Sequence, residues 1–439
     1  MLRTTAAIAA GKLTQAVAKR RGGGSALPGL VAERLDPKIL GRTLASLPRG
    51  IVVVSGTNGK TTTTRMLVAL IRAHGIRVFT NPTGSNFTRG VISALLGEIG
   101  LRGRPVAEMA ILELDEAHAL KFADAVSPTH ALLLNVARDQ LDRFAEIDHT
   151  AKLLAQLAAR TTAGVVLNRD DSLVARSADG VRPGVRVTYF GVDESIADRL
   201  PELMEQDTRT DDAYVVPPPG EDDVLLRPRD ERSFDLVIGA DGDDGGGPAI
   251  GPIELKQRGL AAMMNATAAT AMARHLLGAR FDPDIAASAL GAVTAPFGRG
   301  EVIDADGAPL ELVLVKNPAG FTVALNTYGS TPVRTMIAIN DSYADGRDVS
   351  WLYDVSFESL RTVGVAATSG VRAYDMALRL QYDEVPVGRV EPDLERALAQ
   401  FLAERAGQPA RIFCTYTAMM TLRRDLAARY HLAAFGQEA

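Results

Sequence analysis

The chain has 439 residues, of which 46% are hydrophobic and 23% charged, and its formal net charge is -5. This length exceeds what one hydrophobic core normally organises, so two or three domains are expected. No basic stretch dominates the sequence, which argues against nucleic-acid binding. Cys414 is the only cysteine. A single cysteine excludes a disulfide framework and a multi-cysteine zinc site, and it is typical of a reducing cytoplasm.

Residues 1–50 are predicted to form an N-terminal helical segment. Its apolar run "AAIAA" is too short for a signal-peptide core or a membrane span. Leu2, Ile8, Leu13 and Val17 recur among basic residues with a weak helical period. Two interpretations stay open: an ordinary surface helix that ends at a glycine run, or a weakly amphipathic basic helix that touches an anionic membrane face.

Residues 51–300 are predicted to form a nucleotide-binding domain. The apolar runs "IVVVS", "VAEMAILEL" and "THALLLNV" are typical of buried strands, and "TTTTRMLVALIRAHG" is typical of a helix. Their alternation predicts an α/β fold with a doubly wound parallel sheet. Residues 202–247 are rich in Pro, Gly and Asp, so we expect an irregular insertion of loops or an exposed hairpin there.

Residues 301–439 show a second alternation of strands and helices. The runs "ELVLVK", "TMIAIN", "GVAATS" and "RIFCTY" are predicted strands, and helical patterns separate them. The pattern favours a second, Rossmann-like α/β domain at the C-terminus.

A phosphate-binding loop follows the first of these strands, in the sequence G-T-N-G-K-T-T. Loop amides and the N-terminus of the next helix would cradle phosphate oxygens, Lys60 would reach the terminal phosphates, and the Thr61 hydroxyl would ligate Mg²⁺. The first glycine of the general pattern G-x-x-x-x-G-K-[ST] would fall at Val54, so this loop is a shorter variant. The predicted ATP-binding residues of the loop are Gly56, Thr57, Asn58, Gly59, Lys60, Thr61 and Thr62.

The loop sequence G-T-N-G-K-T resembles that of the Mur ligase family, the ATP-dependent amide-bond ligases of peptidoglycan and folate. "ILELDEAH", "LNVARDQLDRF", "LNRDD", "MMNATAATAMARHLLG" and "FGRGE" follow in the order found in that family. The resemblance implies a Mur ligase-like central domain that binds ATP and Mg²⁺. It also implies that Glu113 binds Mg²⁺ with Thr61, and that Asn265 and Arg299 contact ATP.

Three departures from the family pattern narrow the expected substrate and site. The loop lies close to the start of the sequence, where peptidoglycan Mur ligases place a domain for UDP, so a UDP-linked substrate is not expected. Gln140 stands where many relatives have a metal-coordinating His. Ala262 stands where relatives often have an Asn near the adenine.

The C-terminal segments "VKNPAGF", "NDSYADGRDVSWLYDVSF", "SGVRAYDMALRLQY" and "TYTAMMTLR" resemble the C-terminal domain of the MurT group of this family. That group is the synthetase subunit of lipid II isoglutaminyl synthase, and it works with a glutaminase, GatD. The resemblance implies amidation of the α-carboxylate of D-glutamate in the lipid II stem peptide, through an acyl phosphate and with ammonia from the partner. It places the chain in the cytoplasm, with lipid II at the inner membrane face. MurT sequences often carry a four-cysteine zinc ribbon, which this chain lacks, so no zinc is expected.

The same resemblance implies that an aspartate of the C-terminal domain completes the glutaminase triad. "ADGRDVSWLYD" offers Asp345, Asp348 and Asp354, and we favour Asp348 as the catalytic residue of this domain. The other predicted catalytic residue is Lys60, in the ATP site. Asp345 is equally compatible with a turn cap around the following glycine.

Five further residues are weaker candidates for substrate contact. Asn81, Gly84 and Asn86 follow the second strand, and Lys316 and Asn317 open the C-terminal domain, where they would reach the acyl phosphate. All five types are also common in ordinary loops and turns.

Two other functions remain open from the sequence. One is a Mur-fold ligase of the folylpolyglutamate synthase type, which adds an amino acid and needs no glutaminase. The other is a nucleotide-binding scaffold without turnover. This alternative stays open because Gln140 and Ala262 replace residues that relatives carry at the metal and adenine sites.

Overall fold

The computed structural model describes residues 2–21, 26–81, 88–101, 103–137, 147–197, 214–239, 248–295, 298–329 and 332–432. Within these ranges, no helix has both the length and the apolar character needed to cross a membrane.

The larger sheet is formed by the predicted nucleotide-binding region. Its strands are β1 (Ile51–Ser55), β2 (Val78–Thr80), β3 (Met109–Glu113), β4 (His130–Leu133), β5 (Gly164–Asn168), β6 (Arg186–Val192), β7 (Val224–Pro228), β8 (Ser233–Ile238) and β9 (Ala249–Glu254). They pair in the order β2-β3-β1-β4-β5-β6-β7-β8-β9. Pairing is parallel from β2 through β7 and antiparallel among β7, β8 and β9. The parallel part of the sheet agrees with the expectation from the sequence.

The described part of the expected insertion at 202–247 contains a hairpin, one of the two expected alternatives, but this hairpin is part of the main sheet and not an exposed insertion. Strands β7 and β8 lie there, and they form a hairpin that extends the main sheet, because β7 pairs with β6. The inward residues Val224, Leu226 and Leu236 are fully buried. Two short apolar runs therefore form sheet structure despite their Pro-, Gly- and Asp-rich flanks, because burial against the main domain stabilises them.

Helices cover both faces of the larger sheet. They are α4 (Lys60–Ala73), α9 (Leu260–Leu277), η3 (Gly278–Arg280) and α10 (Pro283–Ala292) on one face, and α5 (Thr88–Glu98), α6 (Glu116–Ala125), α7 (Ile147–Arg160), α8 (Ser172–Ala175) and η1 (Arg176–Gly180) on the other. Side chains of β1 alternate between these layers. Val52 and Val54 pack in the same core as Leu67 of α4, whereas Ile51 and Val53 pack in the core of the opposite face. This is the doubly wound arrangement that the sequence predicts.

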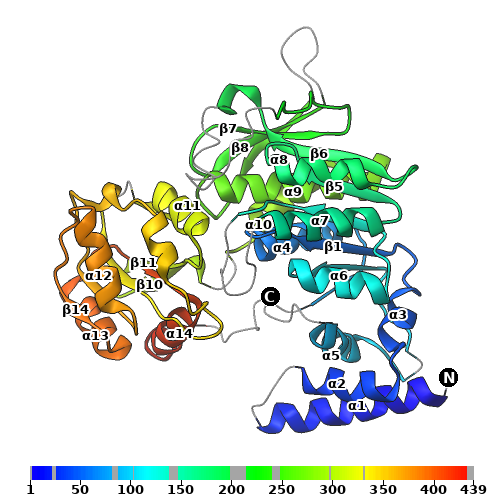
Figure 1. Ribbon diagram of the computed structural model, residues 1–439, viewed down its shortest axis with the longest axis horizontal. Coiled ribbons are helices and arrows are strands. Elements are labelled where there is room, and N and C mark those ends of the chain that lie inside the picture. The colour runs from blue at the N-terminus through cyan, green and yellow to red at the C-terminus, as the bar shows by residue number, and fades with distance from the viewer. Residues whose placement is uncertain are drawn as a thin grey trace.

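Three helices precede the sheet: α1 (Leu2–Arg21), α2 (Leu27–Leu35) and α3 (Ile39–Leu44). Ala7, Ile8 and Gly11 of α1 are buried against α2 and α5. Leu13 and Val17 are 69% and 44% exposed, so the apolar positions of α1 do not form the single stripe that the spacing suggested. Figure 1 shows α1 and α2 as a separate layer beside α5.

The second sheet belongs to the C-terminal domain and begins at Arg299. Its strands are β10 (Arg299–Ala305), β11 (Ala308–Leu314), β12 (Arg334–Ala338), β13 (Ala367–Ser369), β14 (Val390–Glu391) and β15 (Ala410–Cys414), in the order β10-β11-β15-β12-β13-β14. Only the β10–β11 pair is antiparallel. The helices are α11 (Pro318–Tyr328), η4 (Ser350–Asp354), η5 (Glu358–Leu360), α12 (Ala373–Tyr382), α13 (Leu394–Glu404) and α14 (Tyr416–Tyr430).

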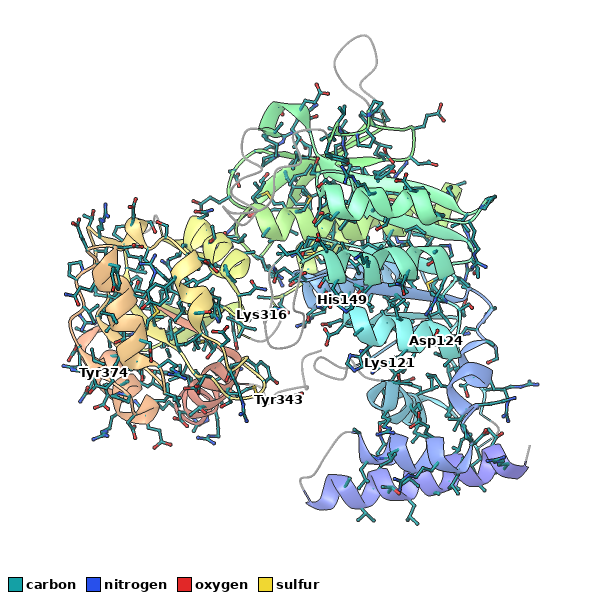
Figure 2. The ribbon with its side chains drawn as sticks, viewed as in Figure 1. Lys121, Asp124, His149, Lys316, Tyr343 and Tyr374 are labelled. Atoms are coloured by element: carbon teal, nitrogen blue, oxygen red, sulfur yellow. The ribbon has the colours of Figure 1, made fainter. Side chains whose placement is uncertain are left out.

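These helices also cover both faces. One core joins the sheet to α13 and α14, and the other joins it to α11, η4 and α12. The carboxyl end of β11 leads into the turn before α11, and Figure 2 shows Lys316 of this turn on the side of the C-terminal domain that faces the central domain. Figure 1 shows the two sheets as separate bodies, so a site between them draws on both.

Candidate nucleotide and ligase site

The loop between β1 and α4 has the backbone shape that a phosphate cradle requires. Gly59 has φ +83° and Gly56 has φ +135°, and both values favour glycine. A Cβ on Gly59 would lie 2.3 Å from Asn265 Oδ1, and a Cβ on Gly56 would lie 3.0 Å from Asn135 N. The loop is therefore shaped for close approach of backbone amides to an anion at the N-terminus of α4, and the predicted loop residues fit phosphate binding.

Lys60, the first residue of α4, is held by groups around the loop. Its Nζ donates to Gly56 O at 2.7 Å and lies 3.2 Å from Asp115 Oδ1 and 3.7 Å from Glu116 Oε1. Burial would raise the pKa of the Asp115 carboxyl, but Lys60 and Lys316 outweigh that effect and hold the pKa below its ordinary value. Asp115 and Glu116 were not singled out from the sequence, although both lie in the "ELDEAH" segment beside Glu113. An incoming phosphate would compete with these two carboxylates for Lys60.

Thr61 and Glu113 lie together, as predicted for a Mg²⁺ site. The Thr61 hydroxyl donates to Glu113 Oε1 at 2.8 Å, and both residues are buried. A hydroxyl and a carboxylate are the hard oxygen ligands that Mg²⁺ prefers, with substrate phosphates and water completing its shell. Across the described ranges, no group of three or more His, Cys, Asp or Glu side chains is placed to hold a metal ion by itself. The two oxygens thus fit a metal that arrives with its nucleotide.

Asn81 directly follows β2, and its side chain bonds to the backbone of the neighbouring strand β3. Its Nδ2 donates to Glu113 O and its Oδ1 accepts from Glu113 N, both at 2.9 Å. The side chain is buried, and its amide makes the same pair of backbone hydrogen bonds to Glu113 that a neighbouring strand would make. Asn81 therefore fixes the backbone of Glu113, the predicted metal ligand, and its side-chain amide is bonded there.

Asn135 is a second positioning amide that the sequence reasoning did not single out. Its Oδ1 accepts from Asn58 N at 2.8 Å and its Nδ2 donates to Asn58 O at 3.1 Å, so it fixes the tip of the phosphate loop. The next residue, Val136, donates its N–H to Asp171 Oδ2 at 2.7 Å. Burial raises the pKa of Asp171 to about 6, although backbone N–H groups of Val136, Leu173 and Val174 counter this effect. The signal was present in the "LNV" and "LNRDD" segments.

The C-terminal domain contacts the phosphate loop through the turn before α11. Lys316 Nζ donates to Thr57 O at 3.3 Å, and Asn317 Nδ2 donates to Asn58 Oδ1 at 3.1 Å. Asn317 is fully buried and also caps α11, where its Oδ1 accepts from Gly320 N at 2.7 Å. Lys316 thus lies where it can act on a bound phosphate, whereas Asn317 joins the two domains.

These groups open into one cleft of about 1200 Å³ between the domains. Lys60, Glu113 and Asn265 line it from the central domain, and Lys316 and Tyr328 line it from the C-terminal domain. Asn265, a predicted ATP contact, is half-buried at the cleft wall. Its Oδ1 accepts from Thr63 Oγ1 at 3.2 Å. Such a volume accommodates a nucleotide together with an acceptor group.

Ala262 lines the cleft at the position where relatives often carry an Asn, so the side chain at this point of the wall is small. Arg299 opens β10, but its side chain lies outside the described residues, as do Gly84, Asn86 and Gln140. The predictions for these four residues therefore stay predictions.

The three candidate aspartates of the C-terminal domain differ in exposure. Asp345 is buried, where its carboxylate accepts from Thr417 N at 2.7 Å and Ser342 N at 3.1 Å. Asp348 is exposed, and its Oδ1 accepts from Ser350 N at 2.8 Å. This hydrogen bond lowers the pKa of Asp348, so the group is a carboxylate at neutral pH. Asp354 is also exposed, at the end of η4. The Asp345 carboxylate is engaged in hydrogen bonds within the domain. Asp348 and Asp354 are exposed and therefore accessible to another molecule.

Comparisons with known proteins agree with this architecture. The Mur ligase middle domain matches residues 54–220, and the MurT ligase C-terminal domain matches residues 314–419. A Streptococcus pneumoniae protein named lipid II isoglutaminyl synthase (glutamine-hydrolyzing) subunit MurT is 30% identical over 98% of this chain and 98% of its own. A Staphylococcus aureus protein of the same name is 29% identical over 89% of each chain.

Solved structures show the same fold at low identity. MurF from Acinetobacter baumannii aligns with a TM-score of 0.66 and 16% identity, covering 91% of this chain and 81% of that one. Folylpolyglutamate synthase from Mycobacterium tuberculosis, complexed with ADP and AMPPCP, aligns with a TM-score of 0.61 and 18% identity, covering 92% and 95%. With its phosphate loop, its two sheets and its match to MurT proteins over nearly the whole length, the chain belongs to the MurT group of the Mur ligase family.

Proposed function

We propose that this chain is the ATP-dependent synthetase subunit that amidates the α-carboxylate of D-glutamate in the lipid II stem peptide. The observation that carries the proposal is one cleft that Lys60, Glu113 and Lys316 line together, with the Thr61 hydroxyl bonded to Glu113 behind it. The similarity to proteins named as lipid II isoglutaminyl synthase subunits supports the choice of substrate.

The proposed chemistry begins with activation of the carboxylate. A carboxylate is a poor acyl donor because oxide is its leaving group, whereas an acyl phosphate releases phosphate. Transfer of the γ-phosphoryl group of ATP to a carboxylate oxygen therefore precedes attack by ammonia, and the products are the primary amide, ADP and phosphate. In phosphoryl transfer the protein mainly positions the reactants and neutralises charge.

Residues of both domains supply that neutralisation. Lys60 and the loop amides would hold the terminal phosphates of ATP, and Thr61 and Glu113 would hold Mg²⁺, which supplies further positive charge there. Lys316 approaches the loop from the opposite side, with its Nζ 3.3 Å from Thr57 O, and would contact the transferred phosphoryl group. Closure of the C-terminal domain over the loop would also exclude water from the acyl phosphate.

Ammonia would come from a glutamine-hydrolysing partner subunit. At neutral pH most free ammonia is protonated and not nucleophilic, so delivery next to the acyl phosphate favours the reaction. Asp348 is exposed and ionised. A carboxylate in this state would orient the histidine of a Cys–His pair in the partner and stabilise its charged form, as in other catalytic triads.

We further propose that the protein works as a peripheral component at the inner membrane face, where a lipid-linked substrate is located. Leu13 and Val17 of α1 are exposed one helical turn apart, which would allow shallow contact with lipid. Co-sedimentation with anionic vesicles checks this point. A Leu13→Asp variant that sediments as well as the wild type contradicts it.

One assay tests the ligase proposal. The purified chain is supplied with ATP, Mg²⁺ and lipid II, and with either ammonium, glutamine plus the partner glutaminase, or a free amino acid as nitrogen source. The product is identified by mass spectrometry. We expect a primary amide at D-glutamate with ammonium and with glutamine plus partner. Ligation of an amino acid in place of ammonia, as in folylpolyglutamate synthases, or nucleotide binding without turnover of any acceptor, would overturn the proposal.

A further inference from the structure

Arg258 joins the two domains through an ion pair at the wall of the nucleotide cleft. It lies between β9 and α9 of the central domain, and its Nη2 donates to Oε1 of Glu311, which belongs to β11 of the C-terminal domain. The two side chains are only 19% and 14% exposed. Because dissolved ions screen a partly buried pair much less than an exposed one, this contact can hold the two domains in one relative position.

The Glu311 carboxylate is shared between Arg258 and a second guanidinium. Arg411 lies opposite Glu311 on the neighbouring strand β15, and its Nε donates to Glu311 Oε2 at 2.8 Å. Arg411 is 1% exposed, so this second pair lies inside the C-terminal domain. Glu311 would keep Arg411 as its partner if Arg258 were removed. Loss of Arg258 therefore breaks the contact between the domains without leaving a buried carboxylate unpaired, which would strongly destabilise the fold.

Tyr328, the last residue of α11, gives Arg258 a second contact with the C-terminal domain. The guanidinium carbon of Arg258 lies 5.2 Å from the centre of the Tyr328 ring, and that of Arg411 lies 5.3 Å from it. Both distances are in the range of a cation–π interaction. Glu311 precedes the turn that carries Lys316, and Tyr328 follows that turn at the end of α11. Arg258 thus contacts both arms of the unit formed by β11, this turn and α11.

The backbone beside Arg258 approaches α11 closely. Gly259 has φ +94°, which favours glycine, and a Cβ there would overlap the side chain of Thr327 on α11. The Gly259 N–H donates to Glu231 O at 2.8 Å, which fixes this backbone to the turn between β7 and β8. The segment that carries Arg258 is therefore anchored in the central domain and packed directly against α11.

Lys316 is at the tip of this unit, and its position depends on how the two arms are held. Its Nζ donates to Thr57 O of the phosphate loop at 3.3 Å. Glu311 lies five residues earlier, which is about 17 Å along an extended strand. Over that length a rotation of about 5° moves the tip by about 1.5 Å, and a displacement of about 1 Å at a reacting group can lower a rate by about 10²-fold. Contacts at Glu311 and Tyr328 can therefore control whether Lys316 reaches a bound phosphate.

We propose that Arg258 is a positioning residue for the formation of the acyl phosphate: by holding Glu311 and Tyr328, it keeps Lys316 at the phosphate loop. This inference rests on the proposed function, in which Lys316 contacts the transferred phosphoryl group. Arg258 then contributes to the rate through Lys316, and not through a contact of its own with ATP or lipid II.

A kinetic test uses the full chain, with lipid II, saturating ATP and ammonium as the nitrogen source. Lys316→Met should lower kcat by about 10²-fold, the effect of removing one charge-stabilising group. Arg258→Met should lower kcat by about 10-fold or more and leave the KM for ATP within about twofold, because it displaces Lys316 without removing it. The variant with both substitutions should be no slower than Lys316→Met by more than about twofold, because effects that act through one group do not add.

Arg227→Met is the matched control. Arg227 is also a partly exposed arginine of the central domain, and its Nη2 lies 2.7 Å from Asp193 Oδ2 within that same domain. Its removal breaks an ion pair that does not join the domains, so kcat should stay within about twofold of the wild type. If Arg258→Met does not fold, Arg258→Lys repeats the test. It keeps a cation for Glu311 but not the planar group over Tyr328, so a smaller loss is expected, again absent when Lys316 is already methionine.

A second measurement follows the domains without any reaction. Lys121→Cys on α6 and Tyr374→Cys on α12 provide one labelling site on each domain, as Figure 2 shows, and the natural Cys414 is buried. Energy transfer between two fluorophores at these sites reports the distance between the domains. Arg258→Met should broaden the distance distribution or shift its mean, whereas Arg227→Met should leave it as in the wild type.

Other outcomes overturn the inference in distinguishable ways. If Arg258→Met changes neither kcat nor the distance distribution while the wild type amidates lipid II with ammonium, the inference is wrong and the proposed function stands. A raised KM for ATP with unchanged kcat would make Arg258 a nucleotide contact instead. Losses that multiply in the variant with both substitutions would show that Arg258 does not act through Lys316. If the wild type uses ammonium under no condition, the proposed function fails and the inference fails with it, whatever the distance between the domains.

Discussion

Two regions of this protein contain candidate functional carboxylates: Glu113 and Asp115 in the central domain, and Asp348 in the C-terminal domain. They differ in how many partners the chain itself provides for these carboxylates. Glu113 and Asp115 are at the carboxyl end of a central strand, with Thr61 and Lys60 as partners and with Asn81 bonded to the Glu113 backbone. Asp348 lies on the outside of the C-terminal domain, and it is held as an ionised carboxylate by a hydrogen bond from the Ser350 backbone. The first region has the groups that the proposed phosphate and metal site needs. The second presents a single carboxylate, which under the proposed function is completed by residues of another polypeptide.

The difference follows from how the two sheets are placed. Loops after β1 and β3 meet at one edge of the larger sheet, and the turn before α11 reaches the same loops from the other domain. Asp348 instead precedes η4, which packs on α12. Changes in the first region should therefore affect every reaction of the protein, and changes in the second only those that need the partner.

Lys60→Met gives the largest expected effect. It removes the cation that would neutralise the terminal phosphates, so lipid II amidation should fall by about 10³-fold, in the range found for charge-stabilising groups. The loss should be equal with ammonium and with glutamine. Steady-state rates with both nitrogen sources check this, with Lys121→Met on α6 as a control for an exposed lysine. A loss confined to one nitrogen source would break the comparison.

Asp348→Asn is expected to affect only the second region, and so only the reaction that needs the partner. The asparagine cannot stabilise a charged histidine in the partner, so glutamine-driven amidation should fall by about 10²-fold or more. Ammonium-driven amidation should stay within about twofold, as expected for a surface substitution far from the chemistry. Asp354→Asn is the matched control at the other end of η4. If Asp354→Asn rather than Asp348→Asn lowers the glutamine rate, the triad role moves to Asp354.

Asn81→Ala sharpens the account of the first region. Loss of the amide that holds the Glu113 backbone should raise the Mg²⁺ concentration for half-maximal activity by about tenfold, the usual scale for groups that orient a metal ligand. A Mg²⁺ titration of ammonium-driven amidation measures the shift. Asn340→Ala removes a comparable amide network in the C-terminal domain and should leave the Mg²⁺ requirement unchanged. Equal shifts in both variants would make Asn81 merely structural.

The smallest effect concerns stability alone. His275 lies at the opposite edge of the larger sheet, where its ring lies 5.4 Å from that of His130. Burial, with repulsion from Arg186 and His130, lowers the pKa of His275 from 6.5 to about 3. The unfolded chain therefore takes up the proton first as pH falls below 6.5, and the folded state loses stability. His275→Asn should remove about 1 to 2 kcal/mol of this loss between pH 7 and pH 5.

The measurement is the difference between wild-type and variant unfolding free energies at the two pH values. The difference is needed because burial raises the pKa values of Asp170 and Asp171 to about 6, which acts in the opposite direction over the same window. Ammonium-driven amidation at pH 7 should be unchanged in the variant. A pH-independent difference in unfolding free energy would contradict the role given to His275.

Much of the fold could be predicted from local sequence. The run "IVVVS" became β1, and Met66, Leu67, Leu70 and Ile71 are all fully buried on one face of α4, because hydrophobic period and backbone geometry are local properties. Lys60 and Thr61 could be predicted for a similar reason, since the loop motif encodes a loop geometry, whereas Glu113 was predicted from the resemblance to the Mur ligase family. A hairpin was one of the two alternatives expected near β7 and β8, but its pairing with β6 was not predicted, because that contact joins segments whose adjacency is not a local property of the sequence.

The positioning residues required the three-dimensional arrangement. Asn81 looks like an ordinary loop residue in sequence, and only the adjacency of β2 and β3 brings its amide to Glu113. Asp115 and Glu116 were visible beside Glu113, but their contact with Lys60 depends on how the loop folds back. The exposure that separates Asp348 from Asp345 depends on the packing of Thr417 against the buried carboxylate.

The central claim is that the chain holds a complete ligase and half of a glutaminase. The most direct test is the rate of ATP-dependent lipid II amidation by the isolated wild-type chain with ammonium and with glutamine, before and after the partner is added. The account predicts amidation with ammonium by the chain alone, none with glutamine, and restored use of glutamine when the partner is present. Use of glutamine by the isolated chain, or no use of ammonium under any of these conditions, would contradict it.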